Sequence, residues 1–166
     1  LAEAKGAVEM MLAQAYVKRS QVALIAFRQN GAEILLPPTR SLTRARRALA
    51  ALPGGGGTPL AAGLQAAQHM AEAAVRVGQT PTIAILTDGK ANVLTDGTAN
   101  REQAMSEAQQ AAKSLAQTGI QCIVIDISPR PRAEAADLAG ALNGRYLPLP
   151  QAQSAAMVAA IESLGG

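Results

Sequence analysis

Two oxygen-bearing side chains, Thr58 and Asp88, are the strongest candidates for chemistry in this sequence. Thr58 follows a run of four glycines, 54–57, and Asp88 lies in a Thr-Asp-Gly turn directly after the apolar run 82–86. A hydroxyl and a carboxylate from separate loops suit a hard cation such as Mg²⁺, which prefers oxygen ligands and usually retains several waters. The same two residues also fit structural roles, Thr58 as a helix N-cap and Asp88 as a turn residue.

Four other polar features are better explained by structure than by chemistry. His69 has no paired ligand or nucleophile and is expected to be an ordinary helix residue. Cys122 lies in an apolar run, which predicts a buried and inert thiol. Asp126 is expected at a rim position or in a salt bridge, because it lies near the carboxyl end of that run. The segment Thr95-Asp96-Gly97 follows no strand and therefore predicts a simple turn.

The elements that must position Thr58 and Asp88 alternate between strands and helices. Continuous apolar runs predict strands over 22–27, 32–36, 82–86, 120–127 and 145–149. Helical spacing of apolar residues predicts helices over 1–17, 41–51, 58–77, 101–118, 133–142 and 151–164. Alternating strands and helices, with strands apolar on both faces, favour the α/β class. We expect an open, mostly parallel, doubly wound sheet with helices on both faces.

Turn and cap residues refine these boundaries. Asn30-Gly31 predicts a hairpin between the first two strands, and Pro37-Pro38 is expected to end the second. Ser41 predicts an N-cap. Thr58-Pro59 predicts the start of the next helix, and Gly78 its end.

The helix after Ser41 is expected to separate apolar from basic positions. Its inward positions are Leu42, Ala45, Leu49 and Leu52, and its outward positions are Arg44, Arg46 and Arg47. Together with Arg40, these arginines form either a solvated face or a surface for an acidic partner.

Composition excludes several functional classes. The net charge is only +3 and aromatic residues are 2% of the chain, so nucleic-acid binding is not expected. A single cysteine rules out an intramolecular disulfide and favours a reducing, cytoplasmic location. No apolar run is long enough to span a membrane.

The first predicted helix, 1–17, has no N-cap residue and no strand before it. We therefore expect residues 1–166 to form a single domain that is truncated on its amino-terminal side. A buried strand should precede Leu1 in the parent chain.

Several ordered motifs resemble a known family. Gly-Gly-Gly-Gly-Thr58-Pro-Leu, followed by Leu86-Thr87-Asp88-Gly89, resembles the second and third metal-binding loops of von Willebrand factor A domains, also called integrin I domains. More narrowly, Val22-Ala-Leu-Ile-Ala-Phe27 and Leu35-Leu-Pro-Pro-Thr39-Arg40-Ser41 are similar to the carboxy-terminal domain of magnesium chelatase D subunits, which act in chlorophyll and bacteriochlorophyll synthesis.

This resemblance implies a metal-ion-dependent adhesion site. Thr58 and Asp88 match its Thr and Asp ligands, and its Asp-x-Ser-x-Ser loop would lie within about ten residues upstream of Leu1. In the family, a bound Mg²⁺ joins the domain to an acidic side chain of a partner.

The resemblance also implies a place in a larger complex. Such a domain would itself be non-catalytic and would dock to the AAA+ motor subunit and the porphyrin-binding subunit in a hetero-oligomeric ring. The whole complex, an ATP-dependent ligase, inserts Mg²⁺ into protoporphyrin IX.

An enzyme is the alternative. A small Rossmann-like or flavodoxin-like enzyme could use Asp88 as a metal ligand or acid/base residue. No nucleophile pair or Gly-x-Gly-x-x-Gly motif accompanies Asp88, and the glycine run 54–57 lacks the Lys-Ser/Thr ending of a phosphate loop.

Overall fold

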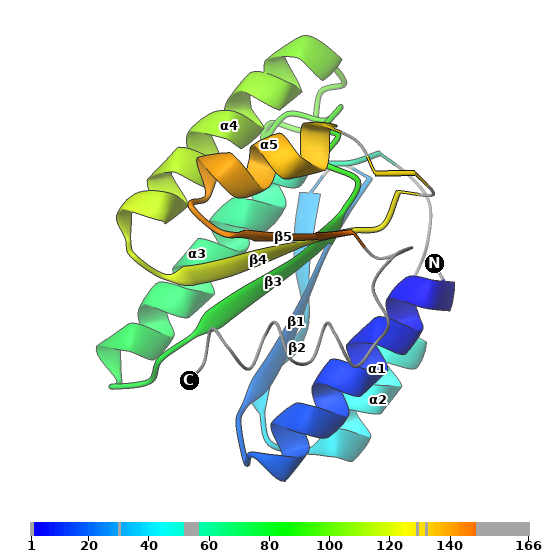
Figure 1. Ribbon diagram of the computed structural model, residues 1–166, viewed down its shortest axis with the longest axis vertical. Coiled ribbons are helices and arrows are strands. Elements are labelled where there is room, and N and C mark those ends of the chain that lie inside the picture. Colours follow the sequence, from blue (N-terminus) through cyan, green and yellow to red (C-terminus); the bar gives the residue numbers. More distant parts are fainter. Residues whose placement is uncertain (1, 30, 52–56, 129, 132, 149–166) are drawn as a thin grey trace.

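The computed structural model describes residues 2–29, 31–51, 57–128, 130–131 and 133–148, and its chain alternates helices with strands (Figure 1). In chain order the elements are α1 (Ala2–Val17), β1 (Val22–Arg28), β2 (Gly31–Thr39), α2 (Leu42–Ala50), α3 (Leu60–Arg76), β3 (Thr82–Thr87), α4 (Arg101–Gln117), β4 (Gln121–Asp126), α5 (Ala133–Ala141) and β5 (Arg145–Pro148). The predicted α/β class is confirmed. The predicted helix 151–164 lies outside the described residues.

The strands form two sheets. β3, β4 and β5 form a parallel sheet in that order, with Thr87 opposite Asp126 and Asp126 opposite Pro148. β1 and β2 form an antiparallel hairpin, as predicted, although Asn30 lies outside the described residues. No strand pairing joins the two sheets in the described part of the chain. The parallel sheet therefore contains three of the five strands that the apolar runs predicted, and the other two form the hairpin.

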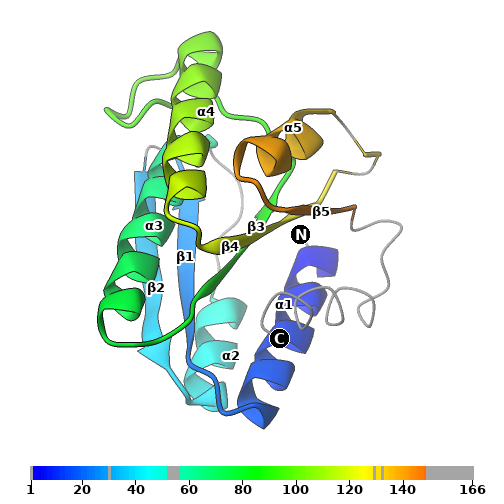
Figure 2. The same ribbon diagram turned by 60° about the vertical axis from the view of Figure 1, so that its left-hand side comes forward.

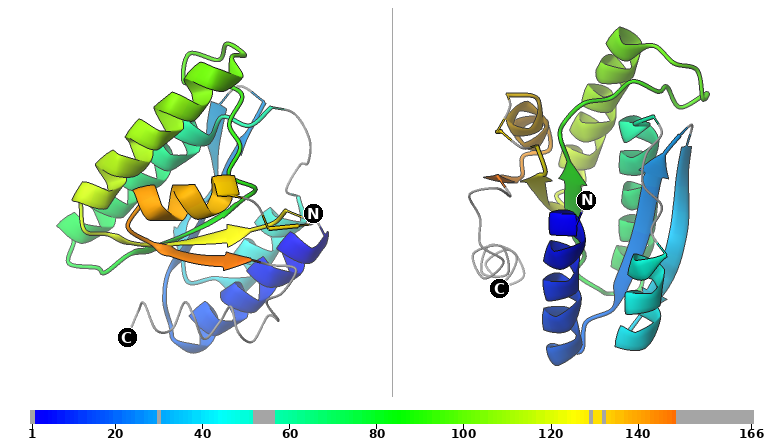
Figure 3. Two further views of the ribbon diagram at one scale, coloured as in Figure 1. Left: turned by 45° about the horizontal axis from the view of Figure 1, so that its top comes forward. Right: turned by 90° about the vertical axis from the view of Figure 1, so that its right-hand side faces the viewer.

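Helices cover both faces of the parallel sheet (Figure 3). The main core lies on one face, where α3, α4 and α5 pack on β3 and β4; its large buried members include Leu60, Leu64, Leu115, Val124 and Leu138. On the other face Ile123 and Ile125 are fully buried, and Met11 of α1 packs against them. β4 is the central strand, so its apolar residues are buried on both sides.

The hairpin has its own layers. On one face, Leu36 of β2 packs with Leu12 of α1 and with Ala45 and Leu49 of α2. On the other, α3 contacts both β1 and β2, and Figure 2 shows the hairpin beside this helix. α2 turns its predicted apolar positions inward, except that Leu52 lies outside the described residues. Arg44, Arg46 and Arg47 are exposed, as predicted.

The second strand does not end at the two prolines. β2 continues through Pro37 and Pro38 to Thr39, which lies opposite Val22. The pairing with β1 shifts register between Val22 and Leu24. β2 pairs with β1 alone within the described sheets, and an edge strand with an irregular register tolerates residues that lack an N–H donor.

Two helix starts differ in their capping. The Ser41 hydroxyl accepts a hydrogen bond from the Arg44 amide at 3.2 Å, which confirms the predicted N-cap. The predicted cap at Thr58 is wrong, because α3 begins at Leu60 with Pro59 in the capping position and has no side-chain cap. Gly78 adopts a φ of 84° and ends α3, as predicted.

Gly63 sets how closely α3 approaches the hairpin. A Cβ at this position would lie 2.7 Å from Cγ of Phe27, a ring atom near the backbone of β1 that cannot swing away. We predict that Gly63→Ala lowers the free energy of unfolding by about 1–3 kcal/mol, because the helix must shift. The exposed Gly6 of α1, with nothing within 4 Å, is the matched control. Gly6→Ala should raise stability by about 0.5–1 kcal/mol. Urea unfolding of both variants checks this, and equal effects would contradict the close packing.

Candidate metal site

The carboxyl ends of the parallel strands place several polar groups along one edge. Thr87 ends β3 and is buried, and its carbonyl accepts a hydrogen bond from the Ile127 amide at 3.1 Å. Asp126, opposite Thr87, ends β4. Asp88 follows Thr87 directly and is half-buried. Ligands of parallel sheets bind at this edge, so Asp88 occupies the position that the sequence predicted.

Short hydrogen bonds hold the Asp88 loop. The Asp88 Oδ1 accepts the Lys90 amide at 2.9 Å, and the Thr87 hydroxyl accepts the Gly89 amide at 3.0 Å. Gly89 has a φ of 83°, and a Cβ there would lie 2.3 Å from the backbone nitrogen of Ala135. The turn is therefore pressed against the start of α5, where only glycine fits, and this contact fixes the position of the Asp88 backbone.

Thr58 is tied to the same loop through Asn92, a residue that the sequence reasoning missed. The side-chain Oδ1 of Asn92 accepts a hydrogen bond from the backbone amide of Thr58 at 2.7 Å. The backbone amide of Asn92 donates in turn to the Thr58 carbonyl at 3.1 Å. Behind them Gly57 is closely packed, since a Cβ there would lie 2.6 Å from Cγ2 of Val93. The loops that carry Thr58 and Asp88 are thus clamped together by Asn92. A polar residue four positions after Asp88 was the only sequence signal for this clamp.

The donor chemistry at this edge fits a hard cation. Thr58 does not cap α3, and within the described residues its hydroxyl has no hydrogen-bond partner. The Oδ2 of Asp88 likewise accepts no hydrogen bond from them. A hydroxyl and a carboxylate oxygen are ligands that Mg²⁺ accepts. The described residues contain no group of three or more His, Cys, Asp or Glu side chains suited to a metal, so Thr58 and Asp88 would form only part of a coordination sphere.

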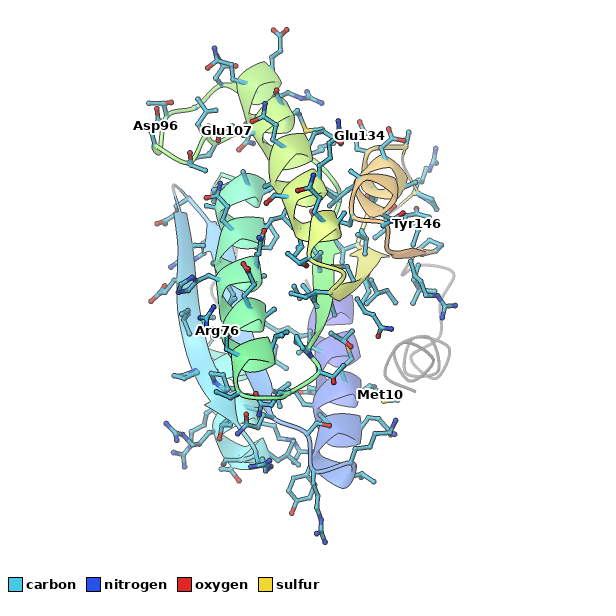
Figure 4. All side chains as sticks on the ribbon, turned by 90° about the vertical axis from the view of Figure 1, so that its left-hand side faces the viewer. Met10, Arg76, Asp96, Glu107, Glu134 and Tyr146 are labelled. Atoms are coloured by element: carbon cyan, nitrogen blue, oxygen red, sulfur yellow. The ribbon has the colours of Figure 1, made fainter. Side chains whose placement is uncertain are left out.

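Asp126 ends β4, at the rim position that the sequence predicted, and its side chain is fully buried there. Its Oδ2 accepts the hydroxyl of Tyr146 at 2.6 Å, and its Oδ1 accepts the Ser128 amide at 2.9 Å. Partial burial, this hydrogen bond and the carboxylate charge raise the pKa of Tyr146 to about 12. Figure 4 shows Tyr146 beside α5. The pair therefore ties β5 to the carboxyl end of β4, and sequence reasoning missed it because it joins residues twenty apart.

The other candidates follow the structural expectations. Cys122 is a buried free thiol, and burial raises its pKa to about 11. His69 is exposed on α3. Asp96 forms the predicted turn: its Oδ1 accepts the hydroxyl and the amide of Thr98, which lowers the Asp96 pKa. Thr95 in this turn donates its amide to Glu107 of α4 at 2.9 Å. Figure 4 shows Asp96 of the turn and Glu107 near each other.

Comparison with known proteins identifies the family. The sequence profile of the von Willebrand factor type A domain matches residues 1–91, more than half of the chain. The chain belongs to this family. Solved structures agree on the fold: the VWA domain of SpRpn10 has a TM-score of 0.68 at 18% identity, covering 98% of this chain and 82% of that one. BatB from Bacteroides thetaiotaomicron has a TM-score of 0.73 at 18% identity, covering 99% and 87%.

Sequence relatives of this von Willebrand factor A domain include magnesium-chelatase subunits. The 60 kDa subunit of Cereibacter sphaeroides is 52% identical over 93% of the chain, and the 67 kDa subunit of Chlorobaculum tepidum is 40% identical over 95%. The chain spans only 28% and 27% of the lengths of these two relatives. An uncharacterized protein of Methanocaldococcus jannaschii is 35% identical, and the match covers 76% of this chain and 71% of that protein. No described helix is long and apolar enough to cross a membrane.

The Asp126–Tyr146 pair predicts how stability depends on pH. Because the pKa of Tyr146 is raised from 10.0 to about 12 in the folded protein, its contribution is complete below pH 10 and is lost as the pH rises towards 12. Tyr146→Phe should remove this alkaline loss. It should also lower stability by about 1–3 kcal/mol at neutral pH, because a buried carboxylate loses a donor. Denaturant unfolding between neutral pH and pH 11 checks both effects. Tyr16→Phe, at an exposed position on α1, is the control. An unchanged pH profile in Tyr146→Phe would contradict this role.

Proposed function

We propose that this domain is a metal-dependent protein-interaction module of a magnesium chelatase D subunit. The observation that carries the proposal is the clamp through Asn92, which holds the loops of Thr58 and Asp88 together at the carboxyl edge of the sheet. Both residues carry hard oxygen donors. Sequence identity of 52% and 49% to two magnesium-chelatase 60 kDa subunits, over more than nine tenths of the chain, supports the same role.

The proposed chemistry is a metal bridge. Thr58 and Asp88 would hold Mg²⁺, and a carboxylate of a partner would complete the coordination. The domain itself would be non-catalytic. Its partners would be the AAA+ motor subunit and the porphyrin-binding subunit, in a cytoplasmic ring complex that inserts Mg²⁺ into protoporphyrin IX at the expense of ATP.

The remaining ligands would come from a longer parent chain. We propose that residues before Leu1 supply a strand followed by an Asp-x-Ser-x-Ser loop. Support comes from the two sheets: β1 and β3 do not pair with each other, and most of their apolar residues are only half-buried, whereas β4 is buried from Cys122 to Asp126. A strand between β1 and β3 would cover these residues and complete a single sheet.

No specific contact favours the alternative, a small enzyme that uses Asp88 as an acid or base. Among the described residues, the hydrogen-bond partner of the Asp88 carboxylate is a backbone amide, that of Lys90, rather than another titratable side chain. A backbone amide orients a ligand but does not exchange protons with it. The site chemistry therefore favours binding.

Docking of the parent protein should depend on the Asp88 carboxylate. We predict that Asp88→Ala lowers the affinity for the AAA+ subunit at least about tenfold with the fold intact, because Asp88 lies in a loop outside the core. EDTA should produce the same loss. Asp96→Ala is the matched control: Asp96 lies in a second Thr-Asp-Gly tripeptide in the same loop, but its carboxylate holds a turn. A binding assay with circular dichroism as the folding control tests this. Docking that survives both EDTA and Asp88→Ala would remove the metal bridge.

Magnesium binding itself should depend on the parent chain. We predict that residues 1–166 bind Mg²⁺ at least about tenfold more weakly than the full-length parent, because Thr58 and Asp88 provide too few protein ligands. In the full-length parent, Asn92→Ala should also weaken Mg²⁺ binding, because it releases the clamp on Thr58. Isothermal titration calorimetry checks both effects. Tight binding by residues 1–166 that persists in Asp88→Ala would refute the assigned ligands.

A further inference from the structure

We call the carboxyl edge of the parallel sheet, where Asp88 lies, the metal edge. A group of exposed arginines lies at the opposite end of the molecule. Here α1 ends and α2 begins (Figure 2). The Nε of Arg40 donates to the carbonyl of Arg19 at 3.1 Å. The connection between β2 and α2 therefore touches the connection between α1 and β1. Arg44 and Arg47 extend the group along α2, where residues three apart share a flank. We call Arg19, Arg40, Arg44 and Arg47 the basic end.

The charge of the surrounding chain is one-sided. Between residues 10 and 71 there are seven basic residues against one acidic residue, a net charge of +6, whereas the rest of the chain has eight against eleven, a net charge of −3. The one acid, Glu33, pairs with Ala26 near the hairpin turn, at the other end of β2 from Thr39 and Arg40. The segment that forms the basic end therefore provides few local counter-charges for its arginines.

Arg19 occupies a position that suits glycine. It has a φ of 57° in the cap that follows α1, where the Ser20 amide donates to the Ala15 carbonyl. α3 and α5 end in the same hydrogen-bond pattern, and the equivalent residues are Gly78 and Asn143, with φ of 84° and 55°. Glycine and asparagine are the residues that tolerate this conformation best. At the end of α1 this position is instead occupied by Arg19, which places a long cationic side chain at the surface. The protein is less stable with arginine here than it would be with glycine.

Helix α2 breaks a second local rule. Acidic residues stabilise the first turn of a helix, because the helix N-terminus carries partial positive charge. The first turn of α2 contains no acid; Arg44 lies in it, and Arg40 directly precedes the N-cap Ser41. The two arginines and the helix N-terminus therefore add positive potential at one place, which favours an anionic partner.

The rim of the basic end is apolar. Tyr16 and Val17, in the last turn of α1, are 56% and 74% exposed. Arginine and tyrosine are enriched in protein interfaces, and an exposed valine gains little from a nucleic-acid backbone. The combination of arginines with an apolar rim matches a polypeptide that carries both carboxylates and apolar side chains.

We propose that the basic end is a second docking surface, which binds an acidic and partly apolar segment of a partner protein. Carboxylates of that segment pair with Arg19, Arg40, Arg44 and Arg47, and its apolar side chains cover Tyr16 and Val17. Because Asp88 lies at the other end of the sheets, this surface works without the metal edge, and its test is independent of the proposed metal bridge.

The test measures binding of a fluorescein-labelled peptide with a Glu-Glu-Leu repeat to the full-length parent protein by fluorescence anisotropy. The double variant Arg44→Glu, Arg47→Glu should lower the affinity at least about tenfold. Arg46→Glu is the matched control, because Arg46 is exposed on the other flank of α2, and it should change the affinity less than about twofold. Added salt should weaken binding of the wild type. EDTA and Asp88→Ala should leave peptide binding unchanged.

Arg19→Gly gives a second, independent readout. It should raise the temperature of half-unfolding, because glycine fits the left-handed cap, and lower peptide affinity about threefold. This variant decides the question if the charge-reversed double variant does not fold.

Three results would overturn the proposal: a Gln-Gln-Leu peptide that binds as tightly as the acidic peptide, equal losses of affinity in Arg46→Glu and the double variant, or unchanged affinity in Arg19→Gly. Tighter binding of oligothymidylate than of the acidic peptide would also overturn it in favour of a nucleic-acid surface.

Discussion

Packing through two helices holds this domain together, because no strand pairing joins its two sheets within the described residues. α3 contacts the hairpin through Gly63 and the parallel sheet through the core around Leu64. α1 does the same on the other side: Leu12 packs with the hairpin and Met11 with β4. Helix packing of this kind is less directional than a strand ladder. The fit of small residues such as Gly63 therefore decides how the sheets are oriented.

The candidate site depends on that orientation. Thr58 precedes α3, whereas Asp88 follows β3, so their relative position is set by how α3 lies on β3. Asn92 then completes the arrangement with two hydrogen bonds to the Thr58 backbone. The close contact of Gly89 with Ala135 adds α5 to the same framework. The loops that carry the oxygen donors are thus held by Asn92 and by the close packing of Gly89 on α5, which suits a ligand that demands regular geometry such as Mg²⁺.

The two ends of the molecule differ in how they use local rules. At the carboxyl edge of the parallel sheet, local preferences and tertiary packing agree, with glycine at the positive φ of Gly89. At the basic end they conflict, since Arg19 adopts a conformation that favours glycine and Arg44 lies in the first turn of a helix. Conflicts of this kind concentrate where a surface serves binding rather than stability.

The sequence by itself determined the α/β class, most element boundaries and the two candidate ligands. Apolar runs and helical spacing are local patterns, so β3, β4 and the helices around them were predictable, as were the Ser41 cap and the turn at Asp96. The positions of Thr58 and Asp88 next to a glycine run and a strand end were local signals as well.

Only the tertiary structure decided the features that join distant residues. It showed that Asn92 rather than a helix cap holds Thr58, that β2 runs through Pro37 and Pro38, and that Asp126 is buried against Tyr146. Each depends on a partner from another element: the backbone of Thr58, the strand β1, the hydroxyl on β5. A hydrogen bond or the burial of a side chain requires both partners to be in place. The spacing of residues in the sequence does not show which distant residue will become the partner in the folded protein.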